Sequence, residues 1–357
     1  MRLLFLSKRR PQQRDLVERP YGRFFHLPTL LSRAGHVVQV ALCSHAGLPS
    51  MAGERGGVQW TSHDLRTLGP LSLIARLEQD AATFRPDWVI GCSDIVYGWM
   101  ARRFARRSGA RFAVDAYDNY EAYMPWNLPL HAVWRSVVAT AHVVTAAGPQ
   151  LAERLDAHRQ GRQPAHIVPM AADPAFVPHH QEESRLALGL PLDAPLIGYM
   201  GGWAQNRGTA ALIDAFRQVR ALRPNARLLL TGRPPAWVIK EPGALPLGYI
   251  EDSMLPIALS ALDVATVITA DTSFGRFSYP AKLCEAIACH VPVAATATEP
   301  VRWMLNNDDR FLAAVDEPGQ LALRILELLD GPRRISYSST PTWEDGARRM
   351  EAALGGA

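Results

Sequence analysis

The chain has 357 residues, more than one compact core usually holds, so the sequence predicts two domains. Hydrophobic residues make up 48% of the sequence and charged residues 20%, which is typical of globular proteins and excludes intrinsic disorder. The formal net charge of +4 does not indicate a nucleic-acid partner, and it suits anionic small molecules or an acidic membrane surface. No stretch of about twenty uninterrupted apolar residues occurs, so we expect no membrane-spanning segment.

The cysteines give no sign of a disulfide framework or a metal site. The sequence has no Cys-x-x-Cys pair and no histidine at zinc spacing from Cys43, Cys92, Cys284 or Cys289. We therefore expect no metal ligands, buried cysteines and a reducing, cytoplasmic setting. The apolar stretch at the N-terminus is far too short for a secretory signal.

The first half of the sequence alternates between predicted strands and helices. Short apolar runs predict strands at residues 3–6, 36–42, 87–90, 111–116, 142–145 and 167–168. Helical patterns predict helices at residues 24–33, 71–84, 97–107, 132–140 and 149–157. Residues 44–69 are rich in Gly, Ser and His and are interpreted as irregular. This alternation predicts a parallel sheet that is covered by helices on both faces.

The alternation lapses at residues 173–195, where prolines cluster, and we place the domain boundary there. It restarts with strands at residues 195–200, 227–231, 263–268, 291–296 and 311–315, and with helices at residues 209–223, 281–289 and 318–329. The sequence therefore predicts two doubly wound α/β domains, residues 1–175 and 176–335. A terminal helix within residues 336–357 is able to pack back on the first domain.

Residues 273–296, SFGRFSYPAKLCEAIACHVPVAAT, are interpreted as a loop, a helix and a buried strand. Pro280 suits the first turn of that helix, because its missing N–H would be unpaired there. Lys282 and Glu285 are three residues apart and share a face near the positive end of the helix. This arrangement suits a phosphorylated ligand that also carries hydroxyl groups. The alternative is an ordinary ion pair on a solvated helix.

Three further positions follow predicted strands of the second domain, where ligands bind in doubly wound sheets. Gly201 and Gly202 let the backbone approach a ligand and leave N–H groups available to an oxyanion. Arg207 ends the same turn, and Arg233 follows the next strand. A tight turn and a solvated loop remain the alternatives. Neither a dinucleotide fingerprint nor a P-loop is present.

Four segments follow one another in the second half: YMGGWAQNRGTAALIDAF, LLLTGRPP, PLGYIEDSMLPIALSALDVATV and SYPAKLCEAIACHVPVAAT. In this order they resemble the donor domain of GT-B glycosyltransferases, especially the group 1 and family 4 enzymes. The first-half segments LLSRAGHVVQVAL, ARFAVDAYDNYEAYMP and HIVPMAADPAFVP fit the same family. The resemblance implies two Rossmann-like domains with a cleft between them. It also implies metal-independent transfer of a sugar, without a cofactor, from a nucleotide donor, UDP-linked by expectation. The acceptor would be a hydroxyl of a saccharide, a lipid-linked molecule or a small molecule.

The same resemblance assigns roles to donor-site residues. The glycine-rich turn and its cations bind the diphosphate, the segment with Tyr249 and Ile250 contacts the base, and Glu285 holds the ribose hydroxyls. The sequence departs from the family pattern in three places: Phe277 replaces the first carboxylate of the usual pair, Gly202 replaces an arginine, and Arg207 replaces a lysine. Ser278, Tyr279 and Lys282 belong to an S-Y-P-x-K variant in which Lys282 supplies the phosphate cation. The missing carboxylate leaves a retaining or an inverting reaction open.

A group of the first domain would have to act on the acceptor. Asp115, Asp118 and Glu121 lie at the end of a predicted strand, and Asp118 is our candidate for the general base because it lies in the loop beyond it. Its alternative role is that of a helix cap or turn residue. Asp94 is the second candidate. The histidines His45, His63, His179 and His180 are expected in surface loops.

Basic and aromatic residues of the first half indicate an anionic or lipid-diphosphate acceptor, or a peripheral contact with the inner face of a membrane. They are the loop at residues 8–23, the segment 124–130, Trp134, and Arg102, Arg103, Arg106 and Arg107. A solvated basic face with core tryptophans is the alternative. Two further functions also stay open: a catalytically inactive GT-B-like binding subunit, and a nucleotide-sugar 2-epimerase.

Overall fold

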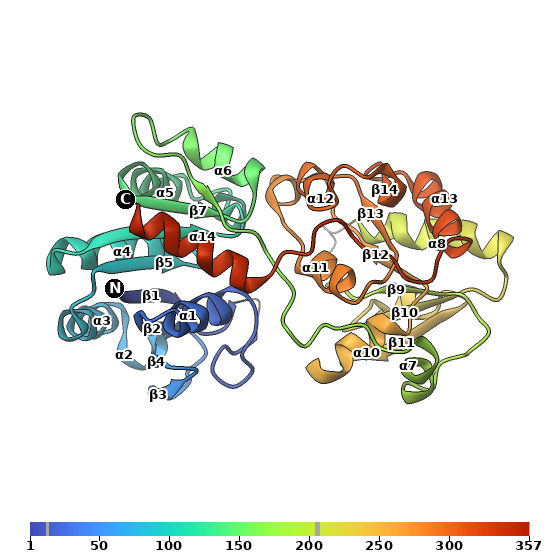
Figure 1. Ribbon diagram of the computed structural model, residues 1–357, viewed down its shortest axis with the longest axis horizontal. Coiled ribbons are helices and arrows are strands. Elements are labelled where there is room, and N and C mark those ends of the chain that lie inside the picture. The colour runs from blue at the N-terminus through green and yellow to red at the C-terminus, as the bar shows by residue number, and fades with distance from the viewer. Residues whose placement is uncertain (12–13, 204–207, 357) are drawn as a thin grey trace. The chain divides into compact units, whose positions relative to one another are not determined.

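The structure is a computed structural model that describes residues 1–11, 14–203 and 208–356. The chain forms two compact units (Figure 1). The first unit comprises Met1–Met170 and Thr342–Ala357, and the second comprises Ala171–Pro341. Each unit is described by itself below. Within the described residues, no helix is both long enough and apolar enough to cross a bilayer.

The described residues of the first unit contain an eight-stranded sheet with the order β3-β4-β2-β1-β5-β6-β7-β8. Its neighbouring strands are parallel, apart from the antiparallel pair β3 and β4. The strands are β1 (Arg2–Lys8), β2 (Val37–Ser44), β3 (Met51–Arg55), β4 (Val58–Asp64), β5 (Trp88–Cys92), β6 (Arg111–Ala116), β7 (Val143–Ala146) and β8 (His166–Ile167). The central strands are buried on both faces, which explains their nearly continuous apolar sequences.

Helices connect these strands in the way that a parallel sheet requires. They are α1 (Arg23–Arg33), α2 (Leu65–Leu68), α3 (Pro70–Phe84), α4 (Ile95–Ser108), α5 (Leu128–Thr140) and α6 (Pro149–Asp156), with the 3-10 helix η2 (Tyr120–Tyr123) before α5. Helix α4 packs against both α3 and α5 (Figure 1). It ends at Gly109, whose φ of 73° is the left-handed conformation that favours glycine after a helix. The C-terminal helix α14 (Trp343–Gly355) packs on α1.

The segment 44–69 differs from its predicted irregular structure, because it contains β3, β4 and α2. Strand β3, with the sequence MAGER, is an exposed edge strand without a run of large apolar residues, so its sequence gives no strand signal. In β4, the buried positions carry polar as well as apolar side chains, so the apolar alternation of a strand is absent. His63 lies in β4 and is buried, and its Nε2 lies 2.9 Å from the Asp80 carboxylate. The expectation of a surface histidine in a loop was therefore wrong for this residue.

The described residues of the second unit contain a six-stranded sheet with the order β11-β10-β9-β12-β13-β14, and its strand pairs are parallel. The strands are β9 (Leu196–Tyr199), β10 (Arg227–Thr231), β11 (Ala244–Gly248), β12 (Val264–Val267), β13 (Val293–Thr296) and β14 (Leu312–Ala313). The α-helices are α7 (Gln181–Ala187), α8 (Thr209–Leu222), α9 (Ala236–Ile239), α10 (Leu255–Ser260), α11 (Ala281–Ala288), α12 (Glu299–Met304) and α13 (Pro318–Leu329). The 3-10 helices are η4 (Asp252–Met254), η5 (Gly275–Phe277) and η6 (Asp309–Phe311).

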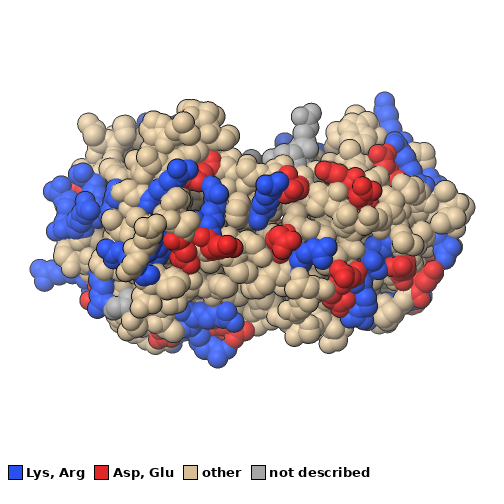
Figure 2. All heavy atoms as spheres, turned by 90° about the horizontal axis from the view of Figure 1, so that it is seen from above, with Lys and Arg blue, Asp and Glu red and all other residues tan. Residues whose placement is uncertain are grey.

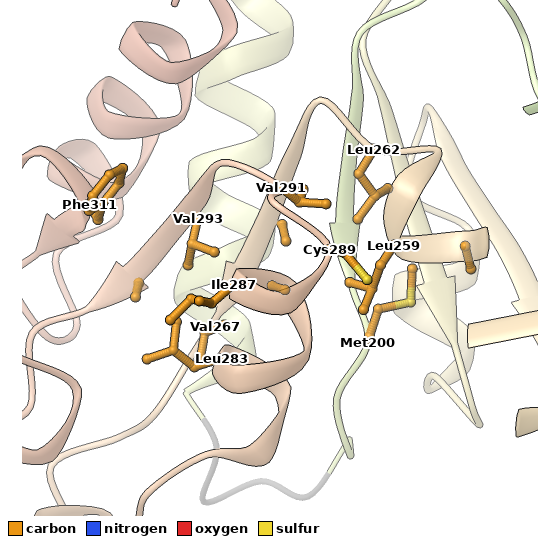
Figure 3. Close-up of a cluster of buried hydrophobic side chains, with 14 of the residues drawn as sticks. Met200, Leu259, Leu262, Val267, Leu283, Ile287, Cys289, Val291, Val293 and Phe311 are labelled. Carbon is orange, nitrogen blue, oxygen red and sulfur yellow. The ribbon is translucent and has the colours of Figure 1, made fainter. Parts of the chain in front are cut away.

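Apolar layers cover the two faces of this second sheet. On one face, Leu283 and Ile287 of α11 lie beside Val267 and Val293 of the strands (Figure 3). On the other face, α8 packs against α13, and Phe216 of α8 is one of the buried side chains of this layer. Helix α8 buries an apolar stripe with helical spacing, as its sequence predicts. These layers fix where α11 begins relative to the strand ends.

Both sheets contain a point at which the strand order reverses. In the first unit, β1 lies between β2 and β5, and in the second unit β9 lies between β10 and β12. The loops that follow the two central strands at such a point diverge, and ligands of doubly wound sheets bind there, outside the carboxyl ends of the strands. The loops after β1 and β5, and those after β9 and β12, are therefore where functional residues are expected.

Candidate functional site

The glycine-rich turn after β9 has a fixed backbone shape. A Cβ atom on Gly201 would lie 2.3 Å from Cζ of Tyr199, so a larger residue there would displace the buried Tyr199 ring. The Tyr199 hydroxyl donates a hydrogen bond to the Gly202 carbonyl at 2.8 Å, and the Trp203 indole donates one to the Thr231 carbonyl at 3.0 Å. By contrast, a Cβ atom on Gly202 would meet no atom within 4 Å. Hydrogen bonds from Tyr199 and Trp203 therefore hold the turn, and no atom lies close to the position that a Gly202 side chain would take. The predicted cation Arg207 lies outside the described residues.

A cation and an aromatic ring lie after the two neighbouring strands. The Gly232 N–H donates a hydrogen bond to the Gly248 carbonyl at 2.7 Å, which joins the ends of β10 and β11. The Arg233 guanidinium lies 5.7 Å from the ring centroid of Tyr249, within the range of a cation–π contact. The Tyr249 side chain is 77% exposed, whereas Ile250 packs partly into the core. This strand end therefore presents an accessible aromatic face and a positive charge.

The loop between β12 and α11 is tightly built. The Thr296 hydroxyl donates to the Thr269 carbonyl at 2.8 Å and accepts from the Thr269 N–H at 2.7 Å, which ties this loop to the end of β13. A Cβ atom on Gly275 would lie 1.9 Å from the Ala270 carbonyl oxygen, so glycine is required there. Ser278 and Tyr279 are buried. These contacts hold the loop in one conformation and so fix the position at which α11 begins.

Lys282 and Glu285 lie in the first part of α11 and form an ion pair with an Nζ–Oε2 distance of 2.9 Å. Their side chains are 37% and 10% exposed, so the pair is only partly solvated. The first N–H groups of a helix have no partners within the helix, and they favour an anion at this end. A phosphate group bound here would compete with Glu285 for the ammonium group of Lys282. Phe277, which occupies the position of the missing carboxylate, is half-buried in η5.

In the first unit, the strand-order reversal brings together Lys8 at the end of β1 and Asp94 after β5. The Lys8 ammonium forms an ion pair with Oδ2 of Asp94, and the Lys8 N–H donates to the Ser93 hydroxyl at 3.0 Å. The other oxygen of Asp94 accepts a hydrogen bond from the Ile95 N–H at 2.6 Å and caps α4. Both carboxylate oxygens of Asp94 therefore have strong structural partners.

Asp118 lies close to the same strand ends with different partners. Its side chain is buried, and it accepts a hydrogen bond from the Tyr123 hydroxyl at 2.8 Å. Burial and the nearby Asp118 carboxylate raise the pKa of Tyr123 well above its ordinary value, so Tyr123 stays a neutral donor. The Lys8 ammonium lies 6.0 Å from the Tyr123 ring centroid, which places both candidate bases around Lys8.

The two other carboxylates of this segment hold the fold together. Asp115 forms two hydrogen bonds of 2.6 and 2.7 Å with the Arg23 guanidinium, and both side chains are almost fully buried. Glu121 pairs with Arg135 at 2.7 Å and also contacts Arg154. Burial alone would raise the pKa of Glu121, but its hydrogen bonds to these two arginines lower it. Neither carboxylate is left available as a base.

The sequence did not indicate two of these contacts. No motif in the sequence pairs Tyr123 with Asp118, although their five-residue separation across a short 3-10 helix is compatible with contact. The sequence places Lys8 only in a basic loop, because its pairing with Asp94 depends on the strand order β1-β5. In the described part of the chain, no group of three or more His, Cys, Asp or Glu residues is arranged as metal ligands. All four cysteines are buried thiols, as predicted.

Comparison with known families decides the classification. The family model described as "Family 4 Glycosyltransferase in conflict systems" matches residues 27–245, more than half of the chain, and the model "Glycosyl transferases group 1" matches residues 194–331. This chain belongs to the family 4 glycosyltransferases. The resemblance predicted from the sequence motifs is therefore confirmed.

One curated relative of this chain is D-inositol 3-phosphate glycosyltransferase of Stackebrandtia nassauensis, which is 27% identical over 243 residues. The match covers 60% of the present chain, and it spans only about half of the relative, 54% of its length.

Solved structures share the two-sheet GT-B fold, as predicted. Sucrose-phosphate synthase of Thermosynechococcus elongatus has a TM-score of 0.74 and 16% identity, with 99% of this chain and 95% of that chain covered. HepE of Anabaena, solved with UDP, has a TM-score of 0.71 and 16% identity over the same shares. A UDP-N-acetylglucosamine 2-epimerase from Listeria monocytogenes, described as putative, has a TM-score of 0.63 and 12% identity, again with 99% and 95% covered.

Proposed function

We propose that the enzyme transfers a sugar from a UDP-linked donor to a hydroxyl group of a saccharide, lipid-linked or small-molecule acceptor, without a metal ion. The observation that carries this proposal is the partly buried Lys282–Glu285 pair at the start of α11, beside the strand-order reversal of the second sheet. The HepE structures with UDP and UDP-glucose support the choice of a UDP-linked donor. The D-inositol 3-phosphate glycosyltransferase relative supports a hydroxyl acceptor.

One group of residues in the second unit binds the diphosphate of the donor. Lys282 and Arg233, together with Arg207, neutralise the charge that develops on the leaving diphosphate, which is where preorganised electrostatics lowers a barrier most. The N–H groups of Gly201 and Gly202 add hydrogen bonds to it. Buried Ser278 and Tyr279 set the position of α11 for this contact.

The nucleoside contacts come from two other places. The exposed face of Tyr249 stacks on the base, and Ile250 lines its edge. Glu285 accepts hydrogen bonds from the ribose hydroxyls, and Lys282 then exchanges this carboxylate for phosphate oxygens. In the first unit, Asp118 takes the proton of the acceptor hydroxyl, with Asp94 as the alternative base. A base that acts directly on the acceptor fits displacement with inversion.

Lys282 provides the decisive experiment. We expect one or more UDP-sugars to raise the melting temperature of the wild type, because a ligand that binds only the folded state stabilises it. With the donor identified in this way, Lys282→Ala should reduce kcat for UDP release about a hundredfold or more. Lys282→Arg keeps the charge and should retain part of the activity. Lys240→Ala, which removes a lysine after α9, is the matched control.

Three outcomes contradict the proposal. Undiminished turnover of the Lys282→Ala enzyme removes Lys282 from the diphosphate site. A product that forms from the donor alone, without an acceptor, indicates a nucleotide-sugar 2-epimerase instead. No thermal shift with any nucleotide sugar, together with no UDP release, indicates a binding subunit that lacks catalysis.

A further inference from the structure

The outward side of α4 carries a stripe that is apolar at its start and basic further along. Val96, Trp99, Arg103 and Arg106 are spaced by three or four residues, so they lie along one side of the helix, with Arg102 next to them. The opposite side is buried, with Tyr97, Met100, Ala101 and Phe104 among the buried residues. Trp99 and the four arginines of α4 line a shallow hollow on this surface.

The charges on this surface are only partly neutralised. Arg103 and Arg107 both contact Glu78 of α3, while Arg102 donates to the Ser136 hydroxyl of α5 at 2.8 Å. Among the described residues, no carboxylate forms an ion pair with Arg102 or Arg106, and the sequences of α4 and α5 contain no acidic residue. Partial burial lowers the pKa of Arg102, and the positive charge of the neighbouring Arg106 lowers it further. Basic side chains gather at the left of Figure 2, the side on which Figure 1 draws α3 and α4.

Exposed apolar side chains occur where α3, α4 and α5 begin. These helices follow the parallel strands β4, β5 and β6, so their first turns lie at the same edge of the sheet. The exposed fractions are 83% for Leu71, 39% for Val96, 76% for Trp126 and 68% for Leu128. We call Leu71, Val96, Trp99, Arg102, Arg106, Trp126 and Leu128 the α4–α5 face.

Apolar groups and unpaired arginines on one surface match the chemistry of a lipid interface. Exposed Trp and Leu side chains lose contact with water when they enter the boundary between headgroups and acyl chains. Arginines on the same helix can lay their apolar stems along that boundary and reach lipid phosphates with their guanidinium groups. A soluble polyanion would neutralise the arginines, but it would leave Leu71, Trp126 and Leu128 exposed to water. Both features together therefore favour a membrane.

We propose that the α4–α5 face binds the surface of an anionic lipid bilayer, with Trp126 and Leu128 inserted at the interface and Arg102 and Arg106 on lipid phosphates. The first unit would thus hold the enzyme at a membrane as a peripheral protein. The loop at residues 8–23 contributes less, because Arg9 and Arg23 are buried in ion pairs with Asp15 and Asp115. Trp134 contributes nothing to this surface, because it is a core residue. The proposal does not depend on the identity of the donor or the acceptor.

Co-sedimentation of the full-length protein with vesicles tests this proposal without any substrate. Vesicles of phosphatidylcholine with about one third phosphatidylglycerol should bind the wild type, and pure phosphatidylcholine should bind it far more weakly. The double variant R102Q/R106Q should lower the partition coefficient roughly thirtyfold, since each basic residue near an anionic surface contributes about 1 kcal/mol. R348Q/R349Q removes two exposed arginines of α14 and is the charge-matched control.

A second pair of variants tests the apolar part. W126S/L128S should lower binding to the anionic vesicles by about tenfold. W237S/L222S changes the same residue types at exposed positions of the second unit and should leave binding unchanged. Raising the salt concentration should weaken binding of the wild type. Equal sedimentation of the wild type and R102Q/R106Q, preference for neutral vesicles, or binding to inorganic polyphosphate without binding to vesicles would each overturn the proposal.

Discussion

Asp94 and Asp118 lie near the same strand ends, and their hydrogen-bond partners separate their roles. Both carboxylate oxygens of Asp94 have partners: one pairs with the Lys8 ammonium, and the other accepts a hydrogen bond from the first N–H of α4. A carboxylate whose two oxygens already accept structural hydrogen bonds is poorly placed to take a proton from an acceptor hydroxyl. Asp118 receives a hydrogen bond from Tyr123, a neutral phenol whose pKa is raised by burial. We therefore keep Asp118, which lies in the loop beyond β6, as the proposed general base.

The substitution Asp118→Asn tests this assignment. The variant enzyme keeps the shape of the side chain but loses the proton acceptor, so kcat for acceptor-dependent UDP release should fall by about a hundredfold to ten-thousandfold. The donor-induced rise in melting temperature should stay, because donor binding is proposed for the other unit. Asp94→Asn retains a capping side chain on α4 and should affect kcat far less. A larger loss for Asp94→Asn than for Asp118→Asn would exchange the two roles.

The sequence also shows how far residue roles can be read without a structure. Lys282 and Glu285 could be paired from their spacing, because helical geometry alone brings residues three apart together. The Arg23–Asp115 and Lys8–Asp94 pairs could not, since 92 and 86 residues separate their members and only the strand order brings them together. The sequence therefore shows Asp115 only as a carboxylate at a strand end, like Asp118, and does not show that a buried arginine binds it.

At the scale of elements, strong apolar periodicity made prediction succeed. Helix α8 was predicted at residues 209–223 and spans Thr209–Leu222, and α3, α4 and α14 agree similarly well. Elements without such a signal were missed. Strand β11, ALPLG, contains Pro and Gly and is only half-buried at the edge of its sheet, and the four-residue helices α2 and α9 are too short to show a period. Tertiary contacts, rather than local sequence, determine these elements.

Asp64 is the last residue of β4 and the N-cap of α2, and it illustrates how a polar strand end is stabilised. Its Oδ1 accepts hydrogen bonds from the N–H groups of Arg66 at 2.8 Å and Thr67 at 3.2 Å and so caps α2. Its Oδ2 accepts from the N–H groups of Gly47 at 2.9 Å and Leu48 at 3.1 Å, in the loop after β2. One buried carboxylate therefore ties the loop after β2 to the end of β4.

We predict that Asp64→Ala lowers the free energy of unfolding by about 2 kcal/mol, the upper range for losing a cap. Burial would raise the pKa of Asp64, but the Ser44 hydroxyl and the backbone N–H groups lower it from 3.8 to about 2. Because the folded-state pKa is lowered, this stabilisation is present above pH 4 and is lost as the pH falls towards 2. Urea unfolding across this pH range measures both effects. Asp193→Asn, at an exposed position, should change neither, and a pH profile of Asp64→Ala identical to the wild type would contradict the prediction.

On the scale of the whole molecule, a segment from the end of the chain completes the first unit. After the second unit ends at Pro341, the chain returns to the first unit as α14 and packs on α1. The Trp343 ring is stacked on His26 with a centroid distance of 5.8 Å, and the His36 Nε2 lies 3.0 Å from the Glu351 carboxylate. The first unit therefore contains residues from both terminal parts of this sequence. Residues 1–170 alone would leave exposed the side of α1 that α14 covers.

Trp343 is the strongest test of this dependence, because it is 2% exposed and among the largest fully buried side chains. Trp343→Ala should lower the free energy of unfolding by about 3 to 5 kcal/mol, through lost burial and the cavity that remains. Trp126→Ala makes the same chemical change at a side chain that is 76% exposed, so it should cost less than about 0.5 kcal/mol. Urea unfolding followed by far-UV circular dichroism compares the two variants. Equal midpoints would mean that α14 contributes little to the first unit. A large loss for Trp343→Ala alone would establish that the returning helix is an integral part of its core.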